Sequence, residues 1–310
     1  MHILFTGGSS FTGMWFVKAL AEAGHKVTAT LLHPESSYED IRKNRVLLLK
    51  EFAKVIENCP FGSPEFIQLI KNTKPDLLCH HAADVTDYKS PHFDYLKATQ
   101  NNTHNIEKII DELQQVGCNK IIITGTVFEQ GEGIGSDDLR AFSPYGLSKG
   151  LSFEIFKYFC SIKNCLLGKF VIPNPFGPYE EERFTTYLIK TWAAGKSATL
   201  SFPLYIRDNI HVSLLAKAYQ KFSENLSPQY LQTNPSGYAE SQQKFTERFA
   251  NEIKARTSLP CLLEIKEQND FPEPLIRINS QPINIEESEW NEKNAWDELV
   301  TYYRKTHNIK

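Results

Sequence analysis

The chain has 310 residues, enough for one large hydrophobic core or for a core with a smaller lobe. Its formal net charge at pH 7 is only −3, with both signs mixed along the chain, which excludes a strongly basic nucleic-acid surface and a polybasic membrane patch. No apolar run approaches the roughly 20 residues that span a bilayer, and the N-terminus has no signal-peptide pattern. We therefore expect a cytoplasmic protein.

The six cysteines are spread along the chain without a Cys-x-x-Cys pair. That spacing is typical of buried or incidental thiols in a reducing compartment, and it indicates neither a disulfide framework nor a zinc site. The adjacent His80 and His81 would point to opposite faces of a strand, which makes them a poor metal pair. We expect no bound metal, and we expect these two histidines and His211 to be structural.

The first half of the chain alternates short apolar strands with helical patterns. In chain order the sequence predicts a strand at 2–6, a helix at 12–23 ended by Gly24, strands at 27–32 and 76–80, a helix at 105–116 ended by Gly117, a strand at 120–124, a helix that begins near Ser143, and a strand at 166–172. Alternation at this spacing predicts an α/β fold with a doubly wound parallel sheet of the Rossmann type.

The second half is less regular. The sequence predicts a rigid Pro-rich loop at 174–177 and helices at 185–194, 214–225, 241–255 and about 287–303. We interpret this half as a smaller, discontinuous mixed α/β lobe that leaves and re-enters the main sheet. The predicted division assigns 1–173 and 205–235 to a dinucleotide-binding Rossmann domain, and 174–204 and 236–310 to a substrate-binding lobe.

A glycine-rich turn, Thr6-Gly7-Gly8-Ser9-Ser10-Phe11-Thr12-Gly13, follows the first strand. Glycines at such a turn let the backbone approach a pyrophosphate at a helix N-terminus, where free N–H groups and the helix dipole favour negative charge. The same turn would also suit a strand–helix connection without a ligand. Its position at the start of an alternating α/β chain favours nucleotide binding.

The segment Ser143-Pro144-Tyr145-Gly146-Leu147-Ser148-Lys149 predicts redox chemistry. Ser143 can cap a helix and Pro144 suits its first position, which places Tyr145 and Lys149 four residues apart on one face. An ammonium about 4 Å from a phenol, at intermediate dielectric, is worth roughly 4 kcal/mol, or about three pKa units. That shift makes a tyrosinate usable as a base near pH 7. The alternative is an ordinary surface pair.

Together these segments resemble the extended short-chain dehydrogenase/reductase family, the nucleotide-sugar epimerases and dehydratases. The resemblance is close over about residues 1–235 and loose over the remainder. It is carried in order by the turn at 6–13, the strand and Ala-Ala turn at 76–83, the strand end at 121–128, the Tyr145/Lys149 pair, and the motifs at 174–178 and 207–212. The order of all of these across the chain indicates the family, since Tyr-x-x-x-Lys alone is common.

The resemblance implies roles for individual residues. Tyr145 would move the proton of a sugar hydroxyl, Thr124 would orient that hydroxyl or carbonyl, and Lys149 would also bind the nicotinamide ribose. Asn174 and Arg207 would bind the nucleotide-sugar substrate together with Thr124. The implied cofactor-binding residues are Gly7, Ser9, Ser10, Phe11, Thr12, Gly13, His33, Ala82, Ala83, Lys149 and Pro173.

Each of the less specific positions also has a purely structural interpretation. Thr124 could be a strand-end threonine that bonds to local backbone. Asn174 could organise its loop, and Arg207 could form a surface ion pair with Asp208. The asparagine of the family's catalytic tetrad falls on Thr99, although Asn101 and Asn102 are close enough to compete for that place.

The departures from the family pattern gather on the adenosine side. Ser10 replaces a glycine, Leu31 stands where NAD users carry an acidic residue for the adenine ribose, and the family's adenine-side aspartate falls on or near Cys59. Without the acidic residue a 2′-phosphate is not repelled, so the cofactor is NAD or NADP. A further possibility is that adenosine recognition has weakened altogether. Nearby candidates for binding a 2′-phosphate are His33, Ser36, Ser37, Arg42 and Arg45.

The reaction type is narrowed by the residues after Thr124. The family's 4,6-dehydratases carry Asp-Glu there, whereas this chain has Gly125-Thr126, which disfavours elimination. We expect an NAD(P)-dependent epimerase of a nucleotide-activated sugar that works through a keto intermediate by hydride transfer. The alternatives are an NADPH-dependent reductase of a 4-keto nucleotide sugar and a non-catalytic nucleotide-binding sensor.

The resemblance also implies a homodimer. In the family, the helices that correspond to 105–116 and 145–160 pair across a dimer axis. The alternative is that their apolar faces are covered by the protein's own sheet. The nucleotide sugar is the expected small-molecule partner, and neither nucleic acid nor membrane is expected.

Overall fold

The computed structural model describes residues 1–286, 288–307 and 309, and the chain divides into two compact units. The first unit comprises 1–132, 139–172 and 216–234, and the second comprises 133–138, 173–215 and 235–310. The predicted division differs most at 205–215, which lies in the second unit because its strand pairs with strands there. The assignment of a nucleotide-binding and a substrate-binding role to the two parts stays a prediction.

The first unit is built on a seven-stranded sheet of order β11-β7-β5-β4-β1-β2-β3, in which every neighbouring pair is parallel. Its strands are β1 His2–Thr6, β2 Lys26–Thr30, β3 Lys54–Ile56, β4 Leu77–His80, β5 Lys120–Thr126, β7 Leu166–Ile172 and β11 Gln232–Thr233. The predicted parallel, doubly wound α/β sheet is confirmed. The chain returns to this sheet through β11, as the sequence predicts.

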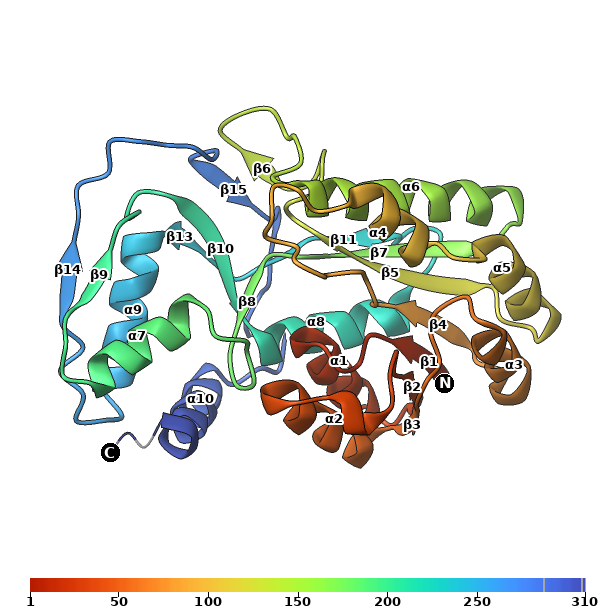
Figure 1. Cartoon of the computed structure of the whole chain (residues 1–310), viewed down its shortest axis with the longest axis horizontal. Coiled ribbons are helices and arrows are strands. Elements are labelled where there is room, and N and C mark those ends of the chain that lie inside the picture. The colour runs from red at the N-terminus through yellow and green to blue at the C-terminus, as the bar shows by residue number, and fades with distance from the viewer. Residues whose placement is uncertain (287, 308, 310) are drawn as a thin grey trace. The chain divides into compact units, whose positions relative to one another are not determined.

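Helices cover both faces of the sheet, and Figure 1 shows α6 and α8 on opposite sides of it. The helices are α1 Phe11–Glu22, α2 Asp40–Phe52, α3 Pro64–Thr73, α4 Tyr95–Asn102, α5 Ile106–Gln115, α6 Pro144–Ile162 and α8 Val212–Asn225, with a short 3-10 turn η1 at Glu35–Ser37. Neighbouring strand residues point to opposite faces, so Leu4 joins the core under α3, α5 and α6 while Phe5 packs against Tyr219 of α8.

Local sequence signals account for the best-predicted helices. The Ser10 and Ser143 hydroxyls each accept a backbone N–H at the start of α1 and α6, and Pro144 opens α6. The helices α2, α3 and α4 and the short strand β3 were not predicted. In α2 only Arg45, Val46 and Leu49 are buried, so its apolar stripe is too narrow for a periodic pattern.

The second unit has a mixed sheet of order β13-β10-β15-β6, with β8 also paired to β10, and two two-stranded sheets, β12-β16 and β14-β9. Its helices α7, α9 and α10 share one apolar core. The bounds are β6 Ile134–Gly135, β8 Asn174–Phe176, α7 Phe184–Ala193, β9 Ala198–Leu200, β10 Ile206–His211, β12 Pro235–Ser236, β13 Tyr238–Ser241, α9 Gln242–Lys254, β14 Leu263–Ile265, β15 Ile276–Ile278, β16 Gln281–Pro282 and α10 Glu292–His307.

Two predictions for this unit need correction. The segment expected to be a rigid loop at 174–177 forms the short strand β8, because Pro175 is tolerated in a strand of three residues that pairs only with β10. The last helix begins at Glu292 and ends at His307, beyond the predicted end at Tyr303. Its predicted first residue, Glu287, lies outside the described residues.

All six cysteines are buried as free thiols. Among the described residues, no helix combines the length and the apolar character that crossing a membrane would take.

Candidate active site

The glycine turn between β1 and α1 is sterically exacting. Gly7 has a φ of +79°, and a Cβ on it would lie 2.7 Å from the backbone nitrogen of Ala82. A Cβ on Gly13 would lie 2.2 Å from the carbonyl oxygen of Gly7. Both positions therefore require glycine. The close approach brings the turn against the Ala82-Ala83 segment after β4, two groups that the sequence assigned to cofactor binding.

The N-terminus of α1 suits an anionic group. Ser10 caps the helix, with its Oγ 3.1 Å from the N–H of Gly13, and the first turn contains no acidic side chain. The partial positive charge of the helix end is therefore not neutralised within its first turn. These features fit the pyrophosphate of a dinucleotide, which would lie against the turn and the helix end.

Tyr145 and Lys149 lie one helical turn apart near the start of α6. Tyr145 is half-buried, and its ring makes edge-on contacts with Tyr88 and Phe93 at centroid distances of 5.4 and 6.0 Å. Lys149 is only 6 % exposed. A surface pair would leave the ammonium in water, so that alternative interpretation of the pair is wrong.

Burial lowers the pKa of Lys149 to about 8; the carboxylate of Glu129 opposes the shift and the ammonium of Lys169 adds to it. Burial, followed by the charge of Lys149, lowers the pKa values of His80 and His81, which places the Lys149 ammonium near the end of β4. Lys149 is thus held at the carboxyl edge of the sheet, where parallel α/β folds bind their ligands.

A buried ionic cluster beside Lys149 was missed by sequence reasoning. Lys169 of β7 lies 2.7 Å from Glu129 and 2.6 Å from Glu132 through its Nζ, and Glu129 also accepts the N–H of Thr126 at 2.8 Å. Glu129 is completely buried, and Lys169 is 3 % exposed. This cluster compensates charges that would otherwise be isolated beneath α6.

Gly125 is a feature of the sequence that could have indicated this cluster. A Cβ at position 125 would lie 2.8 Å from Cε of Lys169. The Gly125-Thr126 pair, interpreted from sequence as the absence of dehydratase acids, therefore also makes room for the buried lysine. The remaining oxygen of Glu132 accepts bonds from the side-chain amides of Gln232 and Asn234 at 3.1 and 3.0 Å.

Thr124 lies at the same edge, in β5. It is 3 % exposed, and its hydroxyl is 3.0 Å from Nδ1 of His81. This contact is to another side chain, so the alternative of a threonine bonded to local backbone is not what the structure shows. The other ring nitrogen of His81, Nε2, lies 3.0 Å from Ser10 and 3.1 Å from Thr12.

His80 and His81 point to opposite faces of the sheet, as predicted. His80 contacts Thr6 and the carbonyl of Asn102, each at 3.0 Å, and its ring stacks on Phe156 of α6. Burial, followed by the charge of Lys149, lowers the pKa of His80 to about 3. Within residues 1–286, 288–307 and 309, no three His, Cys, Asp or Glu side chains are grouped so that they could hold a metal ion.

Of the three positions that compete for the tetrad's asparagine, Asn102 is a buried asparagine, Asn101 is exposed and Thr99 is a buried threonine, and the alignment stays a prediction. Thr99 donates its hydroxyl to the carbonyl of Tyr95 in its own helix. Asn102 is 4 % exposed; its side chain accepts the N–H of Asp84 at 2.8 Å and lies 3.2 Å from the hydroxyl of Ser152 on α6. Asn102 therefore links β4, α4 and α6.

The two positions that the sequence analysis placed beside the adenosine, Leu31 and Cys59, are buried and apolar. Leu31 is 1 % exposed and Cys59 is 2 % exposed, and their backbones are joined by a hydrogen bond of 2.9 Å. Burial raises the pKa of Cys59 to about 11, so the thiol stays neutral near pH 7.

The candidate groups for a 2′-phosphate divide into two sets. Arg45 is completely buried near the ring of Phe11, and Ser37 donates its hydroxyl to the carbonyl of Pro34. His33, Ser36 and Arg42 are exposed. Of the two arginines, only Arg42 is therefore open to an external phosphate.

In the second unit, Arg207 is 7 % exposed and already bonded. Its guanidinium donates to Glu273 at 2.9 Å and to the carbonyls of Ile206, Pro274 and Leu275 at 3.0, 3.1 and 3.2 Å. The alternative of a surface ion pair between Arg207 and Asp208 is wrong, because the carboxylate that Arg207 contacts belongs to Glu273.

Asp208 instead accepts the backbone N–H groups of Gly237 and Asn279 at 2.8 and 3.1 Å. Asn174 is half-buried at the start of β8, directly after Pro173. The substrate-binding roles of Asn174 and Arg207 and the cofactor role of Pro173 stay predictions.

Comparison with known proteins identifies the family and the fold. One relative found is the dTDP-6-deoxy-L-talose 4-dehydrogenase (NAD(+)) of Aggregatibacter actinomycetemcomitans, which is 24 % identical over 167 residues. That alignment covers 52 % of this chain and 56 % of the relative, so it spans about half the length of each.

Solved structures match over nearly the whole chain. The UDP-glucose 4-epimerase of Thermotoga maritima with UDP-glucose has a TM-score of 0.73 and 17 % identity, covering 99 % of this chain and 100 % of that one. The UDP-glucuronic acid 4-epimerase of Bacillus cereus with UDP-glucuronic acid and NAD has a TM-score of 0.73, 14 % identity and the same coverage. At such identities the likeness shows the fold. The model of the NAD dependent epimerase/dehydratase family matches residues 3–230, more than half of the chain, and this chain belongs to that family.

Proposed function

We propose that this chain is an NAD(P)-dependent epimerase that acts on a nucleotide-activated sugar through a keto intermediate. The observation that carries the proposal is the burial of Lys149 one helical turn from Tyr145, at the carboxyl edge of the sheet. A buried ammonium costs free energy, so its retention beside a phenol supports an electrostatic role in proton transfer.

In the proposed reaction, the Lys149 ammonium favours the phenolate form of Tyr145. Tyr145 then accepts the proton of the reacting sugar hydroxyl, and Thr124 hydrogen-bonds that same group. The bound nicotinamide supplies a hydride acceptor and donor. Tyr145 returns its proton to the oxygen when the carbonyl is reduced from the other face, so the sugar carbon inverts with no net consumption of cofactor.

The choice between NAD and NADP is part of the proposal. The relative from Aggregatibacter uses NAD(+), and the Bacillus enzyme was solved with NAD. In this chain Leu31 provides no carboxylate for a ribose, while His33, Ser36 and Arg42 are exposed after β2. We therefore expect both cofactors to bind, with the 2′-phosphate of NADP against Arg42.

A 4-keto reductase is the second candidate. It is favoured by the similarity to a 4-dehydrogenase and by the absence of an acidic residue at Leu31. The two activities differ in stoichiometry, because a reductase oxidises one reduced cofactor in each turnover. A non-catalytic sensor is disfavoured, since it would gain nothing from keeping Lys149 buried.

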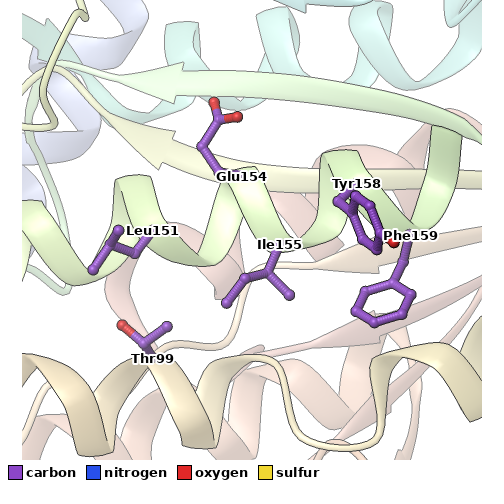
Figure 2. Close-up of a pocket in the computed structure, with 6 residues that line it drawn as sticks. All are labelled: Thr99, Leu151, Glu154, Ile155, Tyr158 and Phe159. Carbon is purple, nitrogen blue, oxygen red and sulfur yellow. The ribbon is translucent and has the colours of Figure 1, made fainter.

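We further propose a homodimer that forms through α6. The apolar face of α5 is covered by the protein's own core, since Ile109, Ile110 and Leu113 are fully buried. By contrast, Tyr158 and Ile162 of α6 are 60 % and 55 % exposed. Figure 2 shows the shallow pocket along α6, with Thr99 of α4 opposite it; its lining residues are Thr99, Leu151, Glu154, Ile155, Tyr158 and Phe159. Light scattering should find a dimer for the wild type and a monomer for the double substitution Tyr158→Lys and Ile162→Lys.

The proposed activity is tested with a panel of UDP- and dTDP-hexoses that differ at C4, each with NAD or NADP. Proton NMR of the sugar should show conversion to the C4 epimer, while absorbance shows no accumulation of reduced cofactor. Tyr145→Phe should lower kcat by about 10²- to 10⁴-fold and leave cofactor affinity unchanged. Wild-type turnover that consumes NADPH stoichiometrically would select the reductase, and equal turnover by Tyr145→Phe would remove the assigned base.

A further inference from the structure

His81 joins two parts of the site that are far apart in sequence. Its Nδ1 lies 3.0 Å from the hydroxyl of Thr124. Its Nε2 lies 3.0 Å from the hydroxyl of Ser10 and 3.1 Å from that of Thr12, both at the start of α1. The ring also lies near the rings of Phe5 and Phe16, at centroid distances of 5.7 and 5.2 Å. Both ring nitrogens therefore have polar partners, and the ring has two aromatic neighbours.

We propose that His81 is a positioning residue that ties the cofactor turn to Thr124 and holds the Thr124 hydroxyl in one rotamer. The inference rests on the proposed function, because it assigns His81 a role through the substrate-orienting threonine. A side chain held from both ends loses little further freedom when a ligand binds, which is the usual benefit of a preorganised site.

The direction of the hydrogen bonds follows from Ser10. Its single hydroxyl proton is donated to the carbonyl of Gly7 at 2.8 Å, and its oxygen accepts the N–H of Gly13 at 3.1 Å. Toward His81 the Ser10 oxygen can therefore act only as an acceptor. The imidazole proton is then on Nε2, Nδ1 is an acceptor, and Thr124 donates its hydroxyl to His81 in the free protein. In the proposed reaction the same hydroxyl proton turns to the sugar oxygen, because threonine has only one proton to donate.

His81 acts here by position and not by taking up a proton. Burial, followed by the charges of Lys149 and His80, lowers its pKa to about 3. The ring therefore stays neutral at any pH at which the enzyme would work, and a neutral ring offers one donor and one acceptor, as the geometry requires.

The inference also explains Ser10, which stands where the family's turn carries a glycine. A glycine there would have no oxygen for Nε2 of His81, and the ring would keep only Thr12 at that end. We therefore expect Ser10→Gly to act in the same direction as a change at His81, and to a smaller extent.

The functional test is a double-mutant cycle. His81→Phe keeps an aromatic ring next to Phe5 and Phe16 but removes both nitrogens, and it should lower kcat about tenfold with little change in cofactor affinity. In a Thr124→Ala background the same change should have no further effect on kcat, because the group through which it acts is gone. His81→Asn, whose amide can replace Nδ1, should restore most of kcat.

His80→Phe is the matched control. It removes the same ring nitrogens from the neighbouring residue, on the opposite face of the sheet. Its effect on kcat should add to that of Thr124→Ala, which separates a general loss of stability from a loss of positioning. Additive behaviour of His81→Phe and Thr124→Ala would overturn the proposal.

A second measurement does not depend on activity. Nitrogen-15 NMR of histidine-labelled protein, with the His81 signals identified by their loss in His81→Phe, should show a neutral ring protonated at Nε2. Thr124→Ala should shift the Nδ1 resonance. A ring protonated at Nδ1, or a cationic ring, would overturn the proposal even in an active enzyme. If no nucleotide sugar is converted, the proposed function fails, and the NMR result alone decides the role of His81.

Discussion

Two regions of the first unit differ in whether they bury charged side chains. At the end that we propose for redox chemistry (the redox end), around α6 and the ends of β5 and β7, two lysines and two glutamates are buried close together: Lys149, Lys169, Glu129 and Glu132. At the adenosine end, the positions at which NAD users carry acidic groups hold Leu31 and Cys59, both buried and uncharged near pH 7.

The difference shows in which region of the unit burial of charge costs folding free energy. Removing an ion from water costs several kcal/mol, and an apolar replacement of similar size is often more stable. The adenosine end buries uncharged side chains, which avoids this cost. The redox end buries ions in spite of the cost, as expected if its charges are needed for proton transfer and the adenosine contacts are not tightly specified.

The largest effect on stability is expected from breaking the buried ionic cluster of Lys169, Glu129 and Glu132. Lys169→Met leaves Glu129 and Glu132 buried without their cation and should cost about 3 to 5 kcal/mol of unfolding free energy, measured by urea denaturation. Lys163→Met is the control, since Lys163 also pairs with two carboxylates, Glu107 and Asp111, but at the surface. It should change stability far less. Equal losses for the two variants would show that the buried cluster has no special energetic role.

The next prediction separates activity from stability. Lys149→Met should abolish turnover and raise the unfolding free energy at pH 7 by up to about 3 kcal/mol, because it removes a buried ammonium. The pKa of Lys149 is lowered to about 8 in the folded protein, so below that pH the wild type bears the full cost of the charge.

Above pH 8 the folded lysine loses its proton before the unfolded one does, and the wild type becomes relatively more stable. The advantage of Lys149→Met should therefore shrink between pH 8 and the ordinary lysine pKa of about 10.5. Urea denaturation at pH 7 and pH 9.5 checks this. A variant less stable than the wild type at pH 7 would mean that the ammonium is a net stabilising group.

The smallest expected effect concerns the adenosine end. Arg42→Ala should weaken NADPH binding about tenfold and leave NADH binding unchanged, because only NADPH carries the 2′-phosphate. Lys43→Ala removes the neighbouring exposed cation and serves as the control. Isothermal titration measures both cofactors; equal weakening of NADH and NADPH by Arg42→Ala would assign the residue to something other than the 2′-phosphate.

What could be predicted from sequence followed local rules. The strand at His2–Thr6, the cap and proline at Ser143 and Pro144, and the Tyr145/Lys149 spacing all rest on contacts within a few residues, and all are present. The helices α2 and α4 escaped prediction because their outward faces are polar and few of their residues are buried. The glycine turn was recognised, but the role of Ser10 in it was not.

The amino-acid sequence by itself determined the parallel α/β order, the cofactor turn and the helix that carries the phenol and the ammonium, because strand periodicity, caps and four-residue spacing are local properties. Only the tertiary structure decided which distant side chains meet. Ser10 and His81 are 71 residues apart, and Lys169 and Glu132 are 37 apart. They become neighbours because β5, β4 and β1 lie side by side, with β7 next to β5. Neither hydrophobic periodicity nor residue spacing encodes that order of strands.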